Sequence, residues 1–204
     1  MKLYMTPGSC STGIHILLEE LDLPFEAYIL NLPAGDHLKP DYLAINPKST
    51  IPTLVRDDGS ALTEFQAIAY WLARKYPKAK LLPGDADGDA QAIEAMDYVV
   101  GTIHGQGYTR IFTTANYTPN EADHEAIKAR GREIVAQSFA IMNAALADKE
   151  YIVGSFSIAD AALFYVEFWA DKIGIALPPH CQAHYQRMRA RPVVQRVLRE
   201  EGYR

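Results

Sequence analysis

The feature of this sequence that most constrains its fold is a change of hydrophobic pattern near residue 77. Before it, short apolar runs typical of strands alternate with helical spacing; after it, only helical spacing occurs, with no hairpin signal. Residues 78–88 between the two patterns include a Pro-Gly-Asp sequence and have no period, which is typical of a connection. We therefore predict two domains, 1–77 and 89–204, joined by a linker at 78–88.

The first half predicts a mixed layer of strands and helices. A strand, a helix and a second strand open the chain, and this order favours a right-handed parallel crossover. The sequence Asp57-Asp58-Gly59-Ser60 predicts a hairpin turn between two later strands. The expected strands are 2–5, 25–32, 53–55 and 61–62, and the expected helices are 11–21, 41–45 and 63–76.

The second half predicts helices alone, at about 88–117, 123–148, 157–173, 180–190 and 193–201. Ser157 and Asp160 have the spacing of a capping box. In this motif the Ser157 side chain accepts from the Asp160 backbone N–H, and the Asp160 carboxylate accepts from the Ser157 backbone N–H. The residues that follow are apolar on nearly all sides, so this helix is expected to be central and buried. Asp160 is therefore interpreted as a folding determinant and not as a catalytic acid.

Three glycines, Gly101, Gly105 and Gly107, lie within the first of these helices, where each costs about 1 kcal/mol relative to Ala. A close approach of another backbone, as at a subunit contact, or a bend beside a cleft would explain them. The alternative is a helix that ends near Gly105.

Composition excludes several classes of function. The 204 residues are 49% apolar and carry a formal charge of −5, which argues against a non-specific nucleic-acid or anionic-membrane binder. Neither a secretory signal nor a lipid-spanning stretch is visible. The only cysteines, Cys10 and Cys181, have no disulfide or metal-ligand spacing, and His180-Cys181-x-x-His184 lacks further ligands nearby. We expect a cytoplasmic protein without a metal.

Cys10 is the first candidate for chemistry. It follows Pro7-Gly8, at the point where the first helix is expected to begin. Unpaired N–H groups and the positive end of the helix dipole favour the thiolate there. The alternative is a small, buried and inert thiol. From the residues alone both interpretations stay open.

The order and spacing of these motifs resemble the cytosolic glutathione S-transferases. The residues that carry the resemblance are Met1 to Ser11, the Asn46-Pro47-Lys48 loop, Ile51-Pro52 before a strand, Leu62-Thr63-Glu64, and Ser157-Ile158-Ala159-Asp160. The opening residues, the loop and the Leu-Thr-Glu sequence are similar to the bacterial beta class. The resemblance implies an α+β thioredoxin-like domain with a four-stranded mixed sheet, an all-α second domain, a homodimer, and glutathione as co-substrate in detoxification.

The resemblance also implies roles for residues of the first domain. Cys10 and Ser11 would stabilise the glutathione thiolate, and Ser11 shares a helix face with His15, which we expect to be a buried structural hydrogen-bonding group. A cis bond between Ile51 and Pro52 would turn the Ile51 backbone groups toward the cysteinyl part of glutathione.

The two charged ends of glutathione need their own partners. The helix N-terminus at Glu64-Phe65 offers N–H groups to the γ-glutamyl carboxylate, and Glu64 offers a carboxylate to the ammonium group. Lys48 is the candidate for the glycyl carboxylate, although a loop lysine is usually only solvated.

The sequence departs from the beta-class pattern at three positions. Met5 stands where the class has a tyrosine, and Phe65 replaces a Ser or Gly. Gly105 occupies the place of a cleft histidine, with His104 adjacent, and one residue turns a helical side chain by about 100°. His104 and Tyr108 are therefore secondary candidates. Together with Tyr98, Phe112 and Tyr117, Tyr108 either lines an apolar pocket or packs in the core.

These observations predict a glutathione transferase that conjugates the glutathione thiolate to a small hydrophobic electrophile. A second enzymatic hypothesis is a thiol transferase or peroxidase acting through a Cys10 mixed disulfide. A third is a non-catalytic binding module with the same fold. No residue in the sequence identifies the electrophile.

Overall fold

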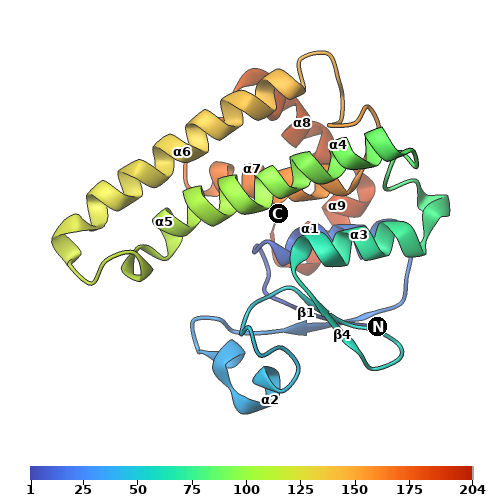
Figure 1. Ribbon diagram of the computed structural model, residues 1–204, viewed down its shortest axis with the longest axis horizontal. Helices are drawn as coiled ribbons and strands as arrows, with labels where there is room; N and C mark the ends of the chain where they lie inside the picture. The colour runs from blue at the N-terminus through green and yellow to red at the C-terminus, as the bar shows by residue number, and fades with distance from the viewer. Residues whose placement is uncertain (204) are drawn as a thin grey trace.

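A four-stranded sheet forms the base of the computed structural model, which describes residues 1–203 (Figure 1). Its strands are β1 (Lys2–Met5), β2 (Glu26–Ile29), β3 (Thr53–Val55) and β4 (Ala61–Thr63), in the order β2-β1-β3-β4. The β1 strand pairs parallel with β2 and antiparallel with β3, and β3 pairs antiparallel with β4. The predicted mixed sheet is confirmed.

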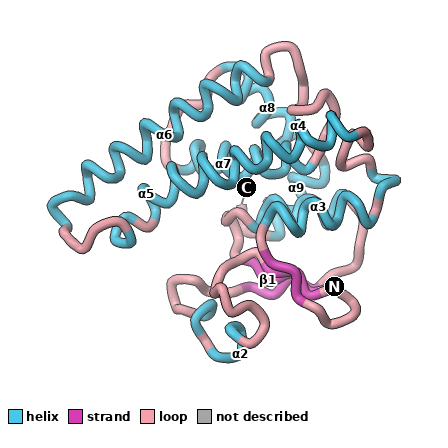
Figure 2. Tube along the Cα trace, in the orientation of Figure 1, coloured by secondary structure: helices cyan, strands magenta, loops and turns pink. Residues whose placement is uncertain are grey.

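Two helices cover the face of the sheet that looks toward the helical half, namely α1 (Ser11–Glu20) and α3 (Phe65–Lys75) (Figures 1 and 2). Leu3 of β1 and Leu54 of β3 are register partners, and both are fully buried in the main core with residues of these helices. Asp36–Leu38, a 3₁₀ turn, and α2 (Pro40–Leu43) lie in the connection that leads to β3.

All the elements after α3 are helical. They are η2 (Pro77–Ala79), α4 (Ala86–Asp97), η3 (Tyr98–Tyr108), α5 (Thr109–Phe112), η4 (Thr114–Asn116), η5 (Glu121–Asp123), α6 (His124–Ala145), α7 (Ile158–Lys172), α8 (Pro179–Ala190) and α9 (Pro192–Glu200). The predicted helices therefore exist, with ends that differ by a few residues. In the described residues 1–203, no helix is both long and apolar enough to cross a membrane.

The α7 helix is the centre of the molecule. Every residue from Ile158 to Ala170 is buried, as the apolar pattern predicts. The predicted capping box is present: the Ser157 hydroxyl accepts from the Ala159 N–H at 3.3 Å, and the Asp160 carboxylate accepts from the Ser157 N–H at 2.8 Å. A fixed N-terminus thus sets the position of the helix against which both halves of the chain pack.

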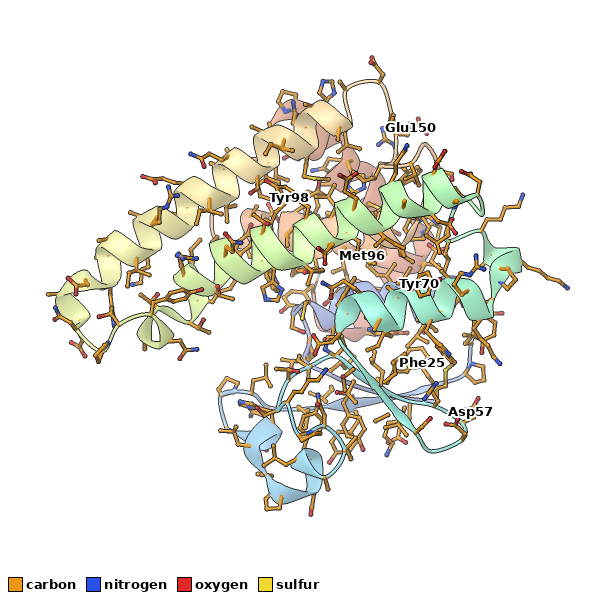
Figure 3. The ribbon with its side chains drawn as sticks, in the orientation of Figure 1. Phe25, Asp57, Tyr70, Met96, Tyr98 and Glu150 are labelled. Carbon is orange, nitrogen blue, oxygen red and sulfur yellow. The ribbon has the colours of Figure 1, made fainter. Side chains whose placement is uncertain are left out.

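The glycine-containing helix does not end near Gly105. The chain passes from α4 into the π-helical segment η3 and stays helical to Phe112. Figure 3 labels Met96 and Tyr98 at this junction, where the Tyr98 hydroxyl donates to Ser138 on α6 at 3.1 Å. A Cβ on Gly107 would lie 2.6 Å from Val135 Cγ2, so this glycine permits close packing of η3 on α6 within one chain.

Candidate functional site

A cavity of about 470 Å³ lies between the loop that leads into α1 and the junction of η3 with α5. Cys10, Ser9 and Ile51 line it from the first half of the chain. His104, Phe112 and Trp169 line it from the helical half. The cavity therefore brings the predicted Cys10 thiol and the predicted Ile51 backbone together with the side chains of His104, Phe112 and Trp169.

Cys10 faces this cavity as a protonated thiol. Its side chain is 9% exposed, and its Sγ lies 3.6 Å from the Ile51 carbonyl oxygen, to which the thiol donates. Burial raises the pKa of the Cys10 thiol to about 12, because desolvation outweighs the lowering by the backbone N–H groups of Cys10 and Ser11, and the Glu64 charge raises the pKa further. Burial thus opposes the effect of the helix N-terminus, which was expected to favour the thiolate.

Ser11 is not placed in the cavity. Its side chain is fully buried, and its hydroxyl donates to the Thr6 carbonyl while accepting from the Thr6 N–H, each at 3.1 Å. The Ser9 and Ser11 hydroxyl oxygens are 2.6 Å apart, and Ser9 lines the cavity. Ser11 therefore organises the loop, while Ser9, which the sequence reasoning missed, is the serine of this loop that lines the cavity.

The Ile51-Pro52 peptide bond is cis, as the resemblance implies. Ile51 is half-buried and lines the cavity, and Pro52 is buried behind it. The structure thus places the Ile51 carbonyl beside the Cys10 thiol and places Ile51 at the cavity. A backbone contact with an extended peptide at Ile51 stays a prediction.

Glu64 and Lys48 form an ion pair at the N-terminus of α3. The Lys48 ammonium nitrogen lies 2.7 Å from a Glu64 carboxylate oxygen and 2.9 Å from the Thr63 hydroxyl. Both charged side chains are about half exposed, at 53% and 56%, so the pair contributes only about 0–1 kcal/mol. A ligand with one ammonium and one carboxylate can therefore separate them at small cost.

The side chain of Phe65 lies in the core, so only its backbone N–H is left for a ligand. The ring is 3% exposed and lies 5.4 Å from the Tyr165 ring in the core. The first N–H groups of a helix have no partner within it, and Phe65 is the first residue of α3. Its predicted role thus rests on the peptide N–H.

His104 points into the cavity, although the offset from Gly105 argued otherwise. His104 lies in the π-helical segment η3 and lines the cavity. His104 Nδ1 lies 3.3 Å from the Tyr165 hydroxyl, and its ring meets Trp169 edge-on at 4.9 Å. Burial lowers the pKa of His104 to about 4, so the imidazole is neutral near pH 7.

Tyr108 is a packing residue behind the cavity wall. It is fully buried, its hydroxyl donates to the Val166 carbonyl at 2.8 Å, and burial raises its pKa well above the ordinary value. Its ring stacks on Phe112 at 5.4 Å and contacts Trp169 at 5.1 Å. Of the four aromatic residues singled out from the sequence, Phe112 lines the cavity. Trp169 lines it as well, and its indole N–H donates to the Gly8 carbonyl.

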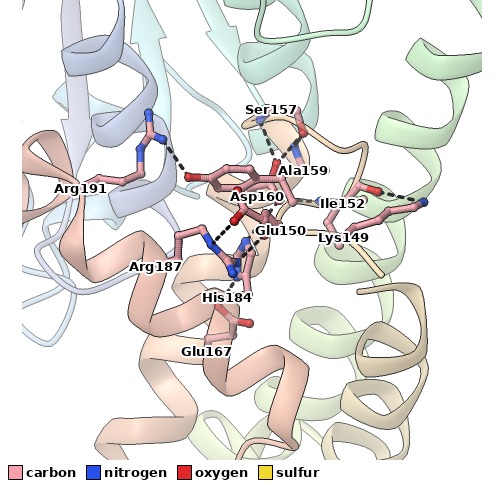
Figure 4. A network of polar contacts seen from close by, with 11 residues as sticks. Lys149, Glu150, Ile152, Ser157, Ala159, Asp160, Glu167, His184, Arg187 and Arg191 are labelled. Atoms are coloured by element: carbon pink, nitrogen blue, oxygen red, sulfur yellow. Dashed lines mark hydrogen bonds and ion pairs between the residues drawn. The ribbon is translucent and has the colours of Figure 1, made fainter. Parts of the chain in front are cut away.

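Three further titratable groups singled out from the sequence, His15, Cys181 and His184, are buried away from this cavity. His184 Nδ1 lies 2.8 Å from Glu167 and its Nε2 lies 3.2 Å from Asp160, in the network of Figure 4. The Cys181 thiol donates to the Phe139 carbonyl at 3.6 Å. His184 and Cys181 of the H-C-x-x-H sequence thus form hydrogen bonds in the core. His15 is buried beside Glu200 and Glu201, as expected of a structural hydrogen-bonding group.

Comparisons with known proteins agree along the whole chain. Residues 8–75 match the family model "Glutathione S-transferase, N-terminal domain", and residues 125–187 match "Glutathione S-transferase, C-terminal domain". Glutathione S-transferase GstA of Escherichia coli O157:H7 is 37% identical over 99% of both chains. A glutathione transferase homologue from Sulfitobacter, solved with bound glutathione, is 32% identical with a TM-score of 0.90 over 98% of this chain and 97% of that one. A beta-class enzyme from Sphingomonas chungbukensis is 30% identical with a TM-score of 0.86, over 99% of each chain.

Proposed function

This chain belongs to the glutathione S-transferase family and is a glutathione transferase, and from that premise we propose how its own residues bind glutathione and activate it. The observation that carries the proposal is the cavity in which Cys10 and Ile51 face His104, Phe112 and Trp169. One wall offers backbone and thiol groups suited to a peptide, and the other offers an apolar aromatic surface. Such a division suits one polar and one apolar substrate.

Glutathione lies along the wall formed by the first domain. Its cysteinyl N–H donates to the Ile51 carbonyl, and its γ-glutamyl carboxylate accepts from the N-terminus of α3 at Phe65. The γ-glutamyl ammonium replaces Lys48 beside Glu64, which frees Lys48 for the glycyl carboxylate. The weak Lys48–Glu64 ion pair supports this exchange, because each charge finds a new partner of opposite sign.

The same placement gives Cys10 a part in activation. Once a ligand N–H satisfies the Ile51 carbonyl, the Cys10 S–H is released to donate to the glutathione sulfur. A hydrogen bond to the charged form lowers the pKa of the glutathione thiol, whose proton passes to solvent. The thiolate then attacks the electrophile: a carbon–sulfur bond forms, and the leaving group departs with its electron pair.

The electrophile lies against Phe112 and Trp169, with the neutral His104 imidazole beside the reacting atoms. We assign His104 to hydrogen bonding with the leaving group or the sulfur. The walls hold the two substrates in contact, which supplies the entropic part of the rate enhancement. A small hydrophobic molecule fits the apolar lining.

The raised pKa of Cys10 also separates the enzymatic alternatives. A thiol transferase that works through a Cys10 mixed disulfide needs the Cys10 thiolate as nucleophile. Burial disfavours that form here, so conjugation is the better-supported reaction. A homodimer in the cytoplasm, with a glutathione-binding domain at 1–77, a connection at 78–88 and a helical domain at 89–204, completes the proposal.

The test is calorimetry with glutathione, together with conjugation of glutathione to 1-chloro-2,4-dinitrobenzene followed by absorbance. We expect binding below millimolar concentration and turnover above the uncatalysed rate. Glu64→Gln should raise Kd for glutathione, whereas Glu121→Gln, an exposed carboxylate on another element, should leave it unchanged. Absence of binding at millimolar glutathione would refute the proposal.

A further inference from the structure

A buried tyrosine that the proposed reaction does not use lies directly behind the cavity wall. Tyr165 is on α7, its side chain is fully buried, and its ring packs against Phe65 at 5.4 Å and Trp169 at 5.0 Å. Its hydroxyl oxygen lies 3.3 Å from His104 Nδ1, and this is the one hydrogen bond that the hydroxyl makes within residues 1–203. Tyr165 therefore holds one ring nitrogen of the histidine that lines the cavity.

This contact fixes which ring nitrogen of His104 carries the proton. A tyrosine hydroxyl can donate or accept, whereas a neutral imidazole has one donor nitrogen and one acceptor nitrogen. If Nδ1 carried the proton, the Tyr165 hydroxyl would accept it, and the proton of that buried hydroxyl would have no acceptor, which is costly. The hydroxyl therefore donates to Nδ1, and the proton of the neutral imidazole is on Nε2.

Burial keeps both groups in the states that this hydrogen bond requires. It raises the pKa of the Tyr165 hydroxyl well above its ordinary value, and the Cys10 charge raises that pKa further. The hydroxyl therefore stays a donor near pH 7. Burial also lowers the pKa of His104 to about 4, so the imidazole that accepts the hydrogen bond is neutral.

The Nε2 atom of His104 is the nitrogen that is open to the cavity. It makes no hydrogen bond within residues 1–203, and it is not among the buried atoms of this part of the chain that lack a partner, so it keeps accessible surface. Thr109 and Thr113 line the same cavity, but their hydroxyls donate to backbone carbonyls four residues earlier in the chain, each at 2.7 Å. The Nε2–H group is therefore a donor that is left for a ligand.

From this geometry we propose that Tyr165 is a positioning residue that fixes His104 as a hydrogen-bond donor, through Nε2, to an oxygen of the electrophile. The inference rests on the proposed function and specifies its substrate class: electrophiles in which attack by sulfur places negative charge on oxygen, such as epoxides. The carbon–sulfur bond forms while the carbon–oxygen bond breaks, and the electron pair of that bond goes to the oxygen. The Nε2–H group stabilises this charge, and the oxygen then takes a proton from solvent, which received one from the glutathione thiol.

The first test needs neither a variant nor glutathione. The ¹⁵N chemical shifts of the His104 ring in labelled, ligand-free protein near pH 7 distinguish the two neutral tautomers. We expect the proton on Nε2 and an Nδ1 that accepts a hydrogen bond. A ring that is protonated at Nδ1 would overturn the inference, and it would leave the proposed conjugation reaction standing.

The second test compares two phenyl electrophiles of similar size in steady-state assays with glutathione. Styrene oxide gains negative charge on its oxygen, whereas benzyl chloride loses a chloride ion, which is a weak hydrogen-bond acceptor. Tyr165→Phe removes only the hydroxyl and should lower kcat for styrene oxide by about tenfold or more, with little change for benzyl chloride or in Kd for glutathione.

Two further variants show whether the hydroxyl acts through the imidazole. Tyr185→Phe is the matched control, because it removes the hydroxyl of another buried tyrosine, which donates to Asp171 at 3.0 Å outside the cavity. It should react like the parent with both electrophiles. In a His104→Ala background, Tyr165→Phe should change kcat for styrene oxide by less than about twofold, because the group through which it acts is gone.

Three kinetic outcomes would overturn the inference. The first is a parent protein that conjugates benzyl chloride but not styrene oxide. The second is an equal loss for both electrophiles in Tyr165→Phe, which would make the hydroxyl a packing contact only. The third is an undiminished loss from Tyr165→Phe in the His104→Ala background. A parent that binds no glutathione and conjugates neither electrophile would refute the proposed function itself, while the tautomer of the ligand-free protein would still decide the pairing of Tyr165 with His104.

Discussion

The protonation state of Cys10 gives the sharpest test of the site, and alkylation at increasing pH measures it. Burial raises the pKa of this thiol from its ordinary value of 9.0 to about 12. At pH 7 the thiolate share therefore falls from about 1% to about 0.001%, since each pKa unit is a factor of ten. Iodoacetamide reacts only with the thiolate, so Cys10 should react about 1,000-fold more slowly than a free thiol.

The assay follows the mass of the Cys10 peptide after timed exposure of the ligand-free protein to the reagent. The rate should increase about tenfold per pH unit up to pH 10 without a plateau. The same protein unfolded in urea is the control, and its Cys10 should react like free cysteine. A plateau with an apparent pKa below 9 in the folded protein would refute the argument from burial and restore the Cys10 nucleophile.

Three further predictions address the reaction, the packing and the buried polar network. Cys10→Ser should keep the conjugation rate within about tenfold of the parent rate, because a hydroxyl donates the same hydrogen bond, and should abolish any disulfide reduction. Loss of both activities in steady-state assays would show that the thiol is indispensable. Gly13→Ala would place a Cβ 2.7 Å from the Ala161 carbonyl oxygen of α7, so chemical denaturation should show a loss of about 1–3 kcal/mol, and an unchanged midpoint would contradict the close α1–α7 contact. Burial opposes protonation of His184, but Glu167 and Asp160 raise its pKa to about 9, while burial raises the pKa of Glu167 to about 7. Each group holds a proton in the folded state that the unfolded chain releases at lower pH. The stability from Glu167 is therefore lost as pH rises from about 4.5 to 7 and that from His184 as pH rises from about 6.5 to 9, by at most about 1.4 kcal/mol per pH unit for one proton. Unfolding curves that show increasing stability over both ranges would contradict this prediction.

The order of elements was predictable because local patterns specify it. The alternation of strand and helix signals before residue 77 corresponds to β1, α1 and β2, and Ser157 with Asp160 does form the cap of a buried helix. Such signals act over one or two turns of chain, so a single sequence contains them. The ends of α4 and α5 were less well placed, because a π-helical segment has no comparable local signature.

The site was predictable only in part. Cys10, Ile51 and Lys48 with Glu64 could be named because each belongs to a short motif. Trp169 and Ser9 were missed: one lies on a helix that is apolar on all sides, and the other differs from Ser11 only in which way the loop turns its hydroxyl. Their roles depend on contacts between segments that are far apart in the chain or on the shape of one loop.

The architecture, a strand-and-helix domain followed by helices, follows from the sequence, since hydrophobic period and capping residues act locally. The environment of each group in the site depends on the tertiary structure. Burial raises the pKa of Cys10, the packing of the two halves brings His104 and Trp169 to the cavity that Cys10 lines, and the meeting of α1 with α9 gathers His15 with three carboxylates. These properties depend on residues that are far apart in the sequence and close in space, and no local sequence pattern predicts them.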